Sequence, residues 1–202
     1  MSGFTKEEIF LNRLGRESFL RFWSWPNLFR DQGGIKGKSD GKEICDLTVI
    51  FGDEILIFSD KKISFNNEID VGISWSRWAR KAIRDSIKQI KGARRWISEY
   101  PDRIYLDPKC EKTIPIHIPT KDSIEFHNND VCHGIEDILS KFNHEASFVL
   151  DNSIHGDNHW DSENCKPFCI GQISEGSFVH IFNESTIELV LREFDTARDF
   201  IL

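Results

Sequence analysis

Two runs of apolar residues, 43–51 and 54–62, stand out in the first third of the chain. The dipeptide Gly52-Asp53 separates them, and such a pair between two apolar runs is typical of a hairpin turn. Apolar side chains occupy both alternating faces of each run, which is typical of strands in the centre of a sheet. The pattern therefore predicts a central β-hairpin.

Helical patterns flank this hairpin. Thr5 and Glu8 have the spacing of a capping box, which predicts a helix that begins there and ends at Pro26. Residues 74–98 carry an apolar stripe at helical spacing, and a similar stripe over 185–202 predicts a last helix. Short apolar runs predict further strands at 114–118, 123–126, 147–151 and 177–182. This order of helices and strands predicts an α/β fold.

Polar residues interrupt the hairpin at three positions. Asp46 lies within the first apolar run, and Asp60 and Lys62 end the second. A buried carboxylate without a partner costs several kcal/mol, so a metal ion is a natural partner for Asp46. Carboxylates from adjacent strands can hold Mg²⁺, which neutralises a phosphate and activates water, and Lys62 shares a strand face with Asp60. The predicted chemistry is phosphodiester hydrolysis, with Asp46 and Asp60 as the metal ligands.

The length of the turn decides whether these side chains meet. A two-residue turn would pair Asp46 with Ser59 and place Asp60 on the opposite face. One extra residue in the turn or the strand would pair Asp46 with Asp60, and this is the register that we predict. A second frame, Ser59-Asp60-Lys61, would offer Lys61 in place of Lys62.

Basic residues concentrate in the first part of the chain. Residues 1–122 carry 22 Lys and Arg against 18 Asp and Glu, whereas residues 123–202 carry 4 against 15, and the net charge is −7. A local concentration of positive charge can steer a polyanion even when the net charge is negative. Six residues form a basic stripe along the predicted helix 74–98 and are candidates for binding the nucleic-acid backbone: Arg77, Lys81, Arg84, Lys88, Lys91 and Arg95.

The order of elements, with Asp46 and then Asp60-x-Lys62 on consecutive strands, resembles the core of the PD-(D/E)XK nuclease superfamily. The segments GKEICDLTVIFGDEILIFSDK and WSRWARKAIRDSIKQIKGARRWI also resemble bacterial proteins of that type. The resemblance implies a restriction-endonuclease-like core, with a central mixed sheet flanked by helices and a C-terminal elaboration. It further implies Mg²⁺ or Mn²⁺ as the cofactor, DNA as the substrate and a role in bacterial defence. Glu17 matches the acidic residue that assists from the first helix, and Glu43 is the alternative.

Two residues depart from the pattern of that superfamily. Cys45 stands at the position of the signature proline, and Asp60 stands where glutamate is usual. The departures leave a second hypothesis, in which an inactive nuclease-fold module binds nucleic acid or a protein partner, or forms a homodimer. A third hypothesis is an interaction domain whose acidic C-terminal half docks a partner.

All 202 residues are expected to form one domain, with a core over 5–120, an insertion over 123–165 and a C-terminal strand and helix over 166–202. The last helix ends on Phe-Ile-Leu without a cap, which favours a fragment of a longer chain. Asn-rich surroundings place His127 and His133 at the surface. The odd number of cysteines and the lack of a leader or a long apolar run predict a cytoplasmic protein without membrane contact.

Overall fold

A computed structural model describes residues 5–33, 41–119, 122–142, 147–173 and 178–193 of the chain. The chain forms two compact units, each built from segments that lie far apart in the sequence. Unit 1 comprises Met1–Ser59, Lys88–Asn128 and Leu191–Leu202, and unit 2 comprises Asp60–Ile87 and Asn129–Val190.

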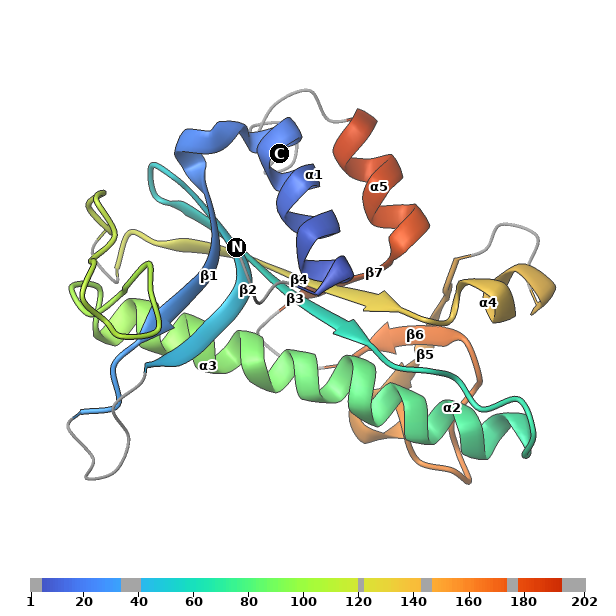
Figure 1. Cartoon of the computed structure of the whole chain (residues 1–202). Helices are drawn as coiled ribbons and strands as arrows, with labels where there is room; N and C mark the ends of the chain where they lie inside the picture. Colours follow the sequence, from blue (N-terminus) through green and yellow to red (C-terminus); the bar gives the residue numbers. More distant parts are fainter. Residues whose placement is uncertain (1–4, 34–40, 120–121, 143–146, 174–177, 194–202) are drawn as a thin grey trace. The chain divides into compact units, whose positions relative to one another are not determined.

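Unit 1 begins with a helix and three strands (Figure 1). These are α1 (Lys6–Trp23), β1 (Ser24–Arg30), β2 (Lys42–Phe51) and most of β3 (Glu54–Lys62). At the start of α1 the Thr5 hydroxyl accepts a hydrogen bond from the Glu8 amide, and the Glu8 carboxylate accepts one from the Thr5 amide. This is the capping box predicted from the sequence, and it satisfies two amides that the helix leaves without partners. β1, which follows directly, was not predicted.

The hairpin of β2 and β3 has a tight turn. Phe51 pairs with Glu54 and Leu47 pairs with Phe58, so the turn holds only Gly52 and Asp53. Gly52 has a φ of 61°, a conformation that favours glycine in such turns.

The predicted extra residue in this hairpin is therefore wrong. Continued by one residue, the observed register sets Asp46 opposite Ser59, as a two-residue turn requires. Because side chains alternate along a strand, Asp60 projects to the other face of β3 from Ser59. The condition under which Asp46, Asp60 and Lys62 would share one face is not met.

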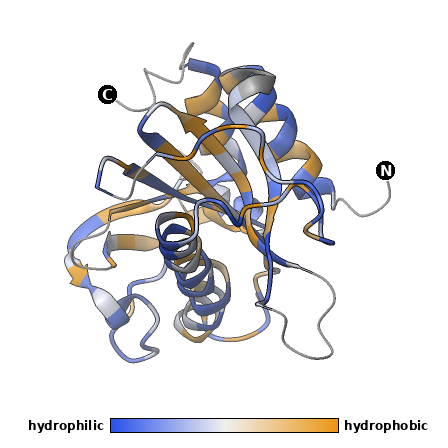
Figure 2. Cartoon of the chain, turned by 90° about the vertical axis from the view of Figure 1, so that its left-hand side faces the viewer, coloured by the Kyte–Doolittle hydropathy of each residue, from blue (hydrophilic) through white to orange (hydrophobic). Residues whose placement is uncertain are grey.

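Different helices of unit 1 cover the two faces of the hairpin. α1 covers the face that carries Phe58, whose ring centroid lies 6.3 Å from that of Phe19. α3 (Asp85–Glu99) covers the opposite face, where the Ser59 hydroxyl donates to Oε1 of Gln89 at 3.2 Å. Figure 2 shows hydrophobic residues along the strands and hydrophilic residues along the long helix. The core of unit 1 is therefore built on the hairpin.

Unit 2 contains all or most of the remaining elements. They are α2 (Val71–Ala79), the π-helical turn η1 (Arg80–Arg84), β4 (Glu125–His133), α4 (Glu136–Phe142), β5 (Val149–His155), the 3₁₀ turn η2 (Gly156–His159), β6 (Cys169–Gln172), β7 (Val179–Asn183) and α5 (Glu184–Glu193). One sheet has the strand order β1-β2-β3-β4-β7, and β5 and β6 pair in parallel as a second sheet.

The five-stranded sheet is mixed. β1, β2 and β3 are antiparallel neighbours, whereas β4 follows the direction of β3. Hydrogen bonds from Glu125 to Asp53 and from Ile63 to His133 fix that parallel direction. The α/β class and the mixed central sheet flanked by helices are thus confirmed. The segment 123–165, predicted to be an insertion, begins with β4, which lies between β3 and β7 in the strand order.

The predicted helix over 74–98 is confirmed, and it runs through α2, η1 and α3. Asp70 caps its start by accepting hydrogen bonds from the amides of Gly72 and Ile73. At the π turn the Asp85 amide bonds to the Arg80 carbonyl, five residues back. An inserted residue rotates every later helical position, so the basic stripe drawn for an unbroken α-helix does not continue across the turn.

Two other predicted elements differ from the structure. No strand forms at 114–118; the nearest pairing in the described chain is an isolated bridge between Tyr105 and Thr113, just before that segment. The helix predicted over 185–202 is present as α5, and residues 194–202 of that prediction lie outside the described residues.

Candidate functional site

A groove in unit 1 lies between α3 and the start of β2, and we refer to it as the α3 groove. It has a volume of about 520 Å³. Its polar lining consists of Arg30, Lys42, Glu43, Lys88, Gln89 and Arg95, and its apolar lining of Ile44, Gly92, Ala93 and Trp96. Four side chains are cationic and one is anionic, so the groove is strongly basic in a chain whose net charge is −7.

Trp96 organises one wall of the α3 groove. The guanidinium of Arg30 lies 4.6 Å from its ring centroid, and that of Arg103 lies 5.2 Å from it. The indole N–H of Trp96 donates to the Arg103 carbonyl at 3.1 Å. Arg103 also binds the Asp31 carboxylate, and the hydrogen bond from Arg103 holds the pKa of Asp31 below its usual value. Two arginines therefore contact the ring of Trp96, and one of them, Arg30, lines the groove.

A β-bulge brings Glu43 into the same groove. Leu28 of β1 pairs with Cys45, and the next residue, Phe29, pairs with Glu43, so Ile44 has no partner on β1. An extra residue in a strand changes the face taken by the residues beyond it. Glu43 accordingly lines the groove beside Lys88 and Gln89 of α3.

Asp46 belongs to the same side of unit 1. The hairpin register sets Asp46 opposite Ser59, and the Ser59 hydroxyl bonds to Gln89 of α3. Glu43 and Asp46 therefore both belong to the sheet face that α3 covers. Glu17 does not join them, because it is an exposed residue of α1, the helix on the opposite face.

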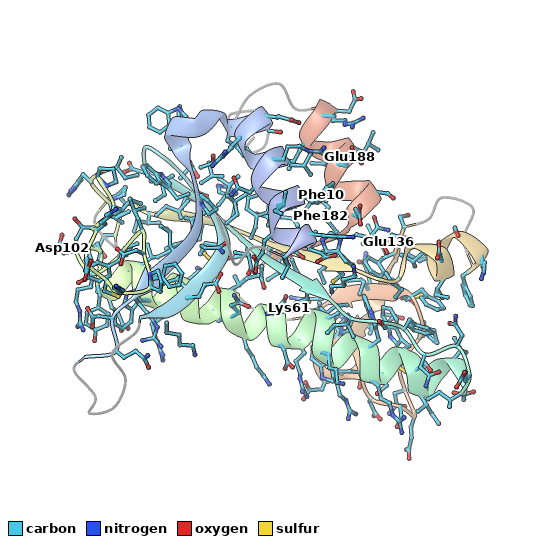
Figure 3. The ribbon with its side chains drawn as sticks, viewed as in Figure 1. Phe10, Lys61, Asp102, Glu136, Phe182 and Glu188 are labelled. Carbon is cyan, nitrogen blue, oxygen red and sulfur yellow. The ribbon has the colours of Figure 1, made fainter. Side chains whose placement is uncertain are left out.

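The other predicted residues are divided between the units. Of the basic stripe, Lys88 and Arg95 line the α3 groove, whereas Lys91 is exposed on α3 outside its lining. The remaining predicted residues belong to unit 2: Asp60, Lys61 and Lys62 at the end of β3, and Arg77, Lys81 and Arg84 on α2 and η1. Figure 3 shows Lys61 on β3.

Unit 2 contains a second group of polar side chains, which we refer to as the His133 cluster: Asp60, His133, Glu136 and Glu184. Nε2 of His133 lies 3.0 Å from Oδ1 of Asp60, and Nδ1 lies 3.1 Å from Oε2 of Glu184. Burial alone lowers the pKa of His133, but the hydrogen bonds and charges of Asp60 and Glu184 outweigh it and raise the pKa to about 9. The imidazole therefore carries a positive charge at neutral pH.

The sequence did not point to this cluster. His133 was expected at the surface because its neighbours Asn128, Asn129 and Asp130 are polar, yet all four residues are buried. Once β4 is known to be an interior strand, the polar run FHNNDVCH becomes a signal, since polar residues in a buried strand must find partners.

Asp130 gives a pH-dependent prediction. Burial raises the pKa of Asp130 well above its usual value, although hydrogen bonds from Ser86 and Cys132 oppose the shift. The folded state then keeps this proton at a pH where the unfolded chain has lost it, so stability falls as pH rises above the usual aspartate pKa. The slope reaches about 1.4 kcal/mol per pH unit for one proton.

Asp130→Asn removes this proton linkage, because asparagine does not ionise. Relative to the wild type, the variant should gain stability as the pH rises above the usual aspartate pKa, as measured by urea unfolding at each pH. Parallel pH profiles for the two proteins would show that Asp130 does not carry a raised pKa.

Comparison of the chain with protein-family models, curated proteins and solved structures finds no match. Among the described helices, none has both the length and the apolar character needed to cross a membrane.

Proposed function

We propose that this protein binds the phosphate backbone of nucleic acid in the α3 groove of unit 1, with DNA as the first candidate. The observation that carries the proposal is the convergence of Arg30, Lys42, Lys88 and Arg95 around one groove that has a single carboxylate. Lysine and arginine bind phosphates by charge, release the condensed counterions and read no sequence. The proposal is therefore sequence-independent binding.

The arrangement of Trp96 supports a backbone contact and not base stacking. Arg30 and Arg103 approach its ring, so Trp96 serves to position arginine side chains. A guanidinium that is already held in place loses less freedom when it binds a phosphate. Arg30 is therefore prepared for this contact before any ligand arrives.

Binding is tested by titrating labelled oligonucleotides with the full chain and measuring fluorescence anisotropy. Duplex DNA, single-stranded DNA and RNA of equal length should all bind, with affinities that fall as salt rises, because the contact is to phosphate. Failure of all three to bind at low salt would reject the proposal. A large preference for one base sequence would contradict backbone recognition.

Metal-dependent hydrolysis is a second candidate, favoured by the placement of Glu43 and Asp46 on the sheet face that α3 covers. Carboxylate oxygens are the donors that Mg²⁺ and Mn²⁺ prefer, and Glu43 and Asp46 both supply them on this face. A bound ion would neutralise charge on a phosphate and activate water.

Hydrolysis gives its own prediction. Asp46→Asn and Glu43→Gln should each lower the rate of plasmid or oligonucleotide cleavage in Mg²⁺ or Mn²⁺ by at least about 10–100-fold, since even groups that only orient a metal's ligands have effects of that size. Asp102→Asn, which changes an exposed acid of unit 1, should cleave like the wild type. A wild-type chain that binds DNA but does not cleave it would reject hydrolysis and leave the binding proposal intact.

A further inference from the structure

The His133 cluster of unit 2 holds a buried imidazole between two carboxylates. The side chains of Asp60 and His133 are each only 3% exposed, whereas that of Glu184 is 49% exposed. Asp60 meets Nε2 of the ring, and Glu184 at the start of α5 meets Nδ1. One ring nitrogen is thus directed toward the buried acid and the other toward the opening of the cluster.

Glu136 at the start of α4 contributes a third carboxylate (Figure 3). Its Oε2 accepts hydrogen bonds from the amides of Gly134 and Ile135, at 2.9 and 3.0 Å, which fix the orientation of the carboxylate. Its Oε1 is buried and accepts no hydrogen bond from any described residue. A buried carboxylate oxygen without a donor is costly, and a cation is the partner that would satisfy it.

The backbone at Gly134 turns so that Glu136 comes close to His133. Gly134 has a φ of 86°, and a Cβ atom there would meet the Ile63 carbonyl oxygen at 2.7 Å. Only glycine fits both the conformation and the space. The turn at Gly134 ends β4 and brings Glu136 back toward the ring of His133, which a longer or wider connection would not do.

We propose that the His133 cluster is a binding site for a Zn²⁺-class divalent transition metal, with Nδ1 of His133 and one oxygen each of Glu136 and Glu184 as ligands. The metal displaces the proton on Nδ1, which is released to solvent, and the ring keeps its Nε2 proton toward Asp60. The three ligand atoms lie within 4.8 Å of one another. Zn²⁺ with bonds near 2.05 Å places tetrahedral ligands about 3.3 Å apart, close to the 3.1 Å between His133 and Glu184.

Asp60 supports the site through the far side of the ring. A histidine that binds a metal through one nitrogen commonly donates its other N–H to a carboxylate, which fixes the tautomer and the ring orientation. Asp60 stands at that position, 3.0 Å from Nε2. One imidazole and two carboxylates suit Zn²⁺ better than Mg²⁺, which prefers oxygen donors alone. Three protein ligands also leave a position for water or a small substrate.

The test is a calorimetric titration of the EDTA-treated full chain with ZnCl₂. The wild type should bind one Zn²⁺ per chain, and Glu136→Gln and Glu184→Gln should each weaken that binding at least tenfold. Asp60→Asn should weaken it by about 10–100-fold, the range typical of groups that orient a ligand. Asp137→Asn, an exposed acid adjacent to Glu136, is the matched control and should bind like the wild type.

Glu184→Gln separates loss of the metal site from loss of the fold, because this half-exposed side chain can be changed without disturbing the core. Circular dichroism confirms that each variant is folded. Absence of one-to-one Zn²⁺ binding by the wild type would overturn the site, as would equal affinities for Glu184→Gln and Asp137→Asn. These measurements need no nucleic acid, so the proposed zinc site is tested independently of nucleic-acid binding in the α3 groove.

Discussion

Charge reversal at Lys88 and Arg95 together should weaken DNA binding by on the order of 100-fold at about 0.1 M salt. Both side chains line the α3 groove, and each is exposed on α3. Losing one phosphate contact costs close to tenfold at this salt concentration, because each contact releases about 0.9 counterion. The new glutamates add repulsion from the phosphates. Anisotropy titration of a labelled duplex measures the effect.

The matched control reverses Lys109 and Lys112, two exposed residues of unit 1 that lie outside the groove lining. The control changes the net charge by the same amount as the groove variant. If general charge governed binding, the two double variants would lose equal affinity. Binding in the groove predicts that the control stays within a few-fold of the wild type.

Trp75→Ala should lower the free energy of unfolding by about 3–5 kcal/mol, the usual cost of emptying a large aromatic site in a core. Trp75 is fully buried in unit 2. Its ring stacks on Trp78 at 5.5 Å and meets Phe168 edge-on at 5.4 Å. Its indole N–H donates to the His159 carbonyl at 3.0 Å, so the truncation also leaves a buried acceptor unsatisfied.

Urea unfolding followed by circular dichroism measures this loss. Leu150→Ala, in the same unit but with a side chain that is 84% exposed, should change stability by no more than about 0.5 kcal/mol. A cost below 1 kcal/mol for Trp75→Ala would contradict the placement of this ring at the centre of the unit 2 core.

Local chemistry explains what could be predicted from the sequence. The capping box of Thr5 and Glu8 acts within one helical turn, and the apolar stripe of the long helix repeats at a fixed period. Neither feature depends on distant residues. The π turn at Arg80–Arg84 has no comparable local signal. A helix accepts an extra residue when tertiary packing compensates for it. The sequence therefore predicts an unbroken basic stripe that the structure does not contain.

β1 was missed because Pro26 was interpreted only as the end of a helix. The helix in fact ends at Trp23, and Pro26 lies within β1. β1 is the terminal strand in the sheet order, where one side of the strand has no neighbour and the missing N–H of proline is tolerated. Pro26 is therefore incompatible with a central strand but compatible with an edge strand such as β1.

The candidate site depended on register, which the sequence did not determine. Gly52-Asp53 is compatible with a two-residue turn and with a longer one, and a change of one residue exchanges the faces of every later side chain. The observed turn separates Asp60 from the face of Asp46, and the bulge at Ile44 brings Glu43 to that face. Neither the tight turn nor the bulge leaves a local pattern that distinguishes it.

The prediction that His133 lies at the surface was wrong because it rested on the polarity of neighbouring residues. Its polar neighbours resemble a loop, and only the pairing of β4 within the sheet shows that they are buried. Long-range strand pairing is the least local property of a fold, so a buried polar cluster built on it is invisible until the sheet is known.

The salt dependence of DNA affinity tests the α3 groove most directly. For the wild type, the logarithm of the association constant should fall linearly with the logarithm of salt concentration, with a slope near −0.9 for each phosphate contacted. The Lys88→Glu, Arg95→Glu double variant should have a slope that is shallower by about 2, whereas the Lys109→Glu, Lys112→Glu variant should keep the wild-type slope. Equal slopes for the wild type and the groove variant would contradict binding of nucleic acid in the α3 groove.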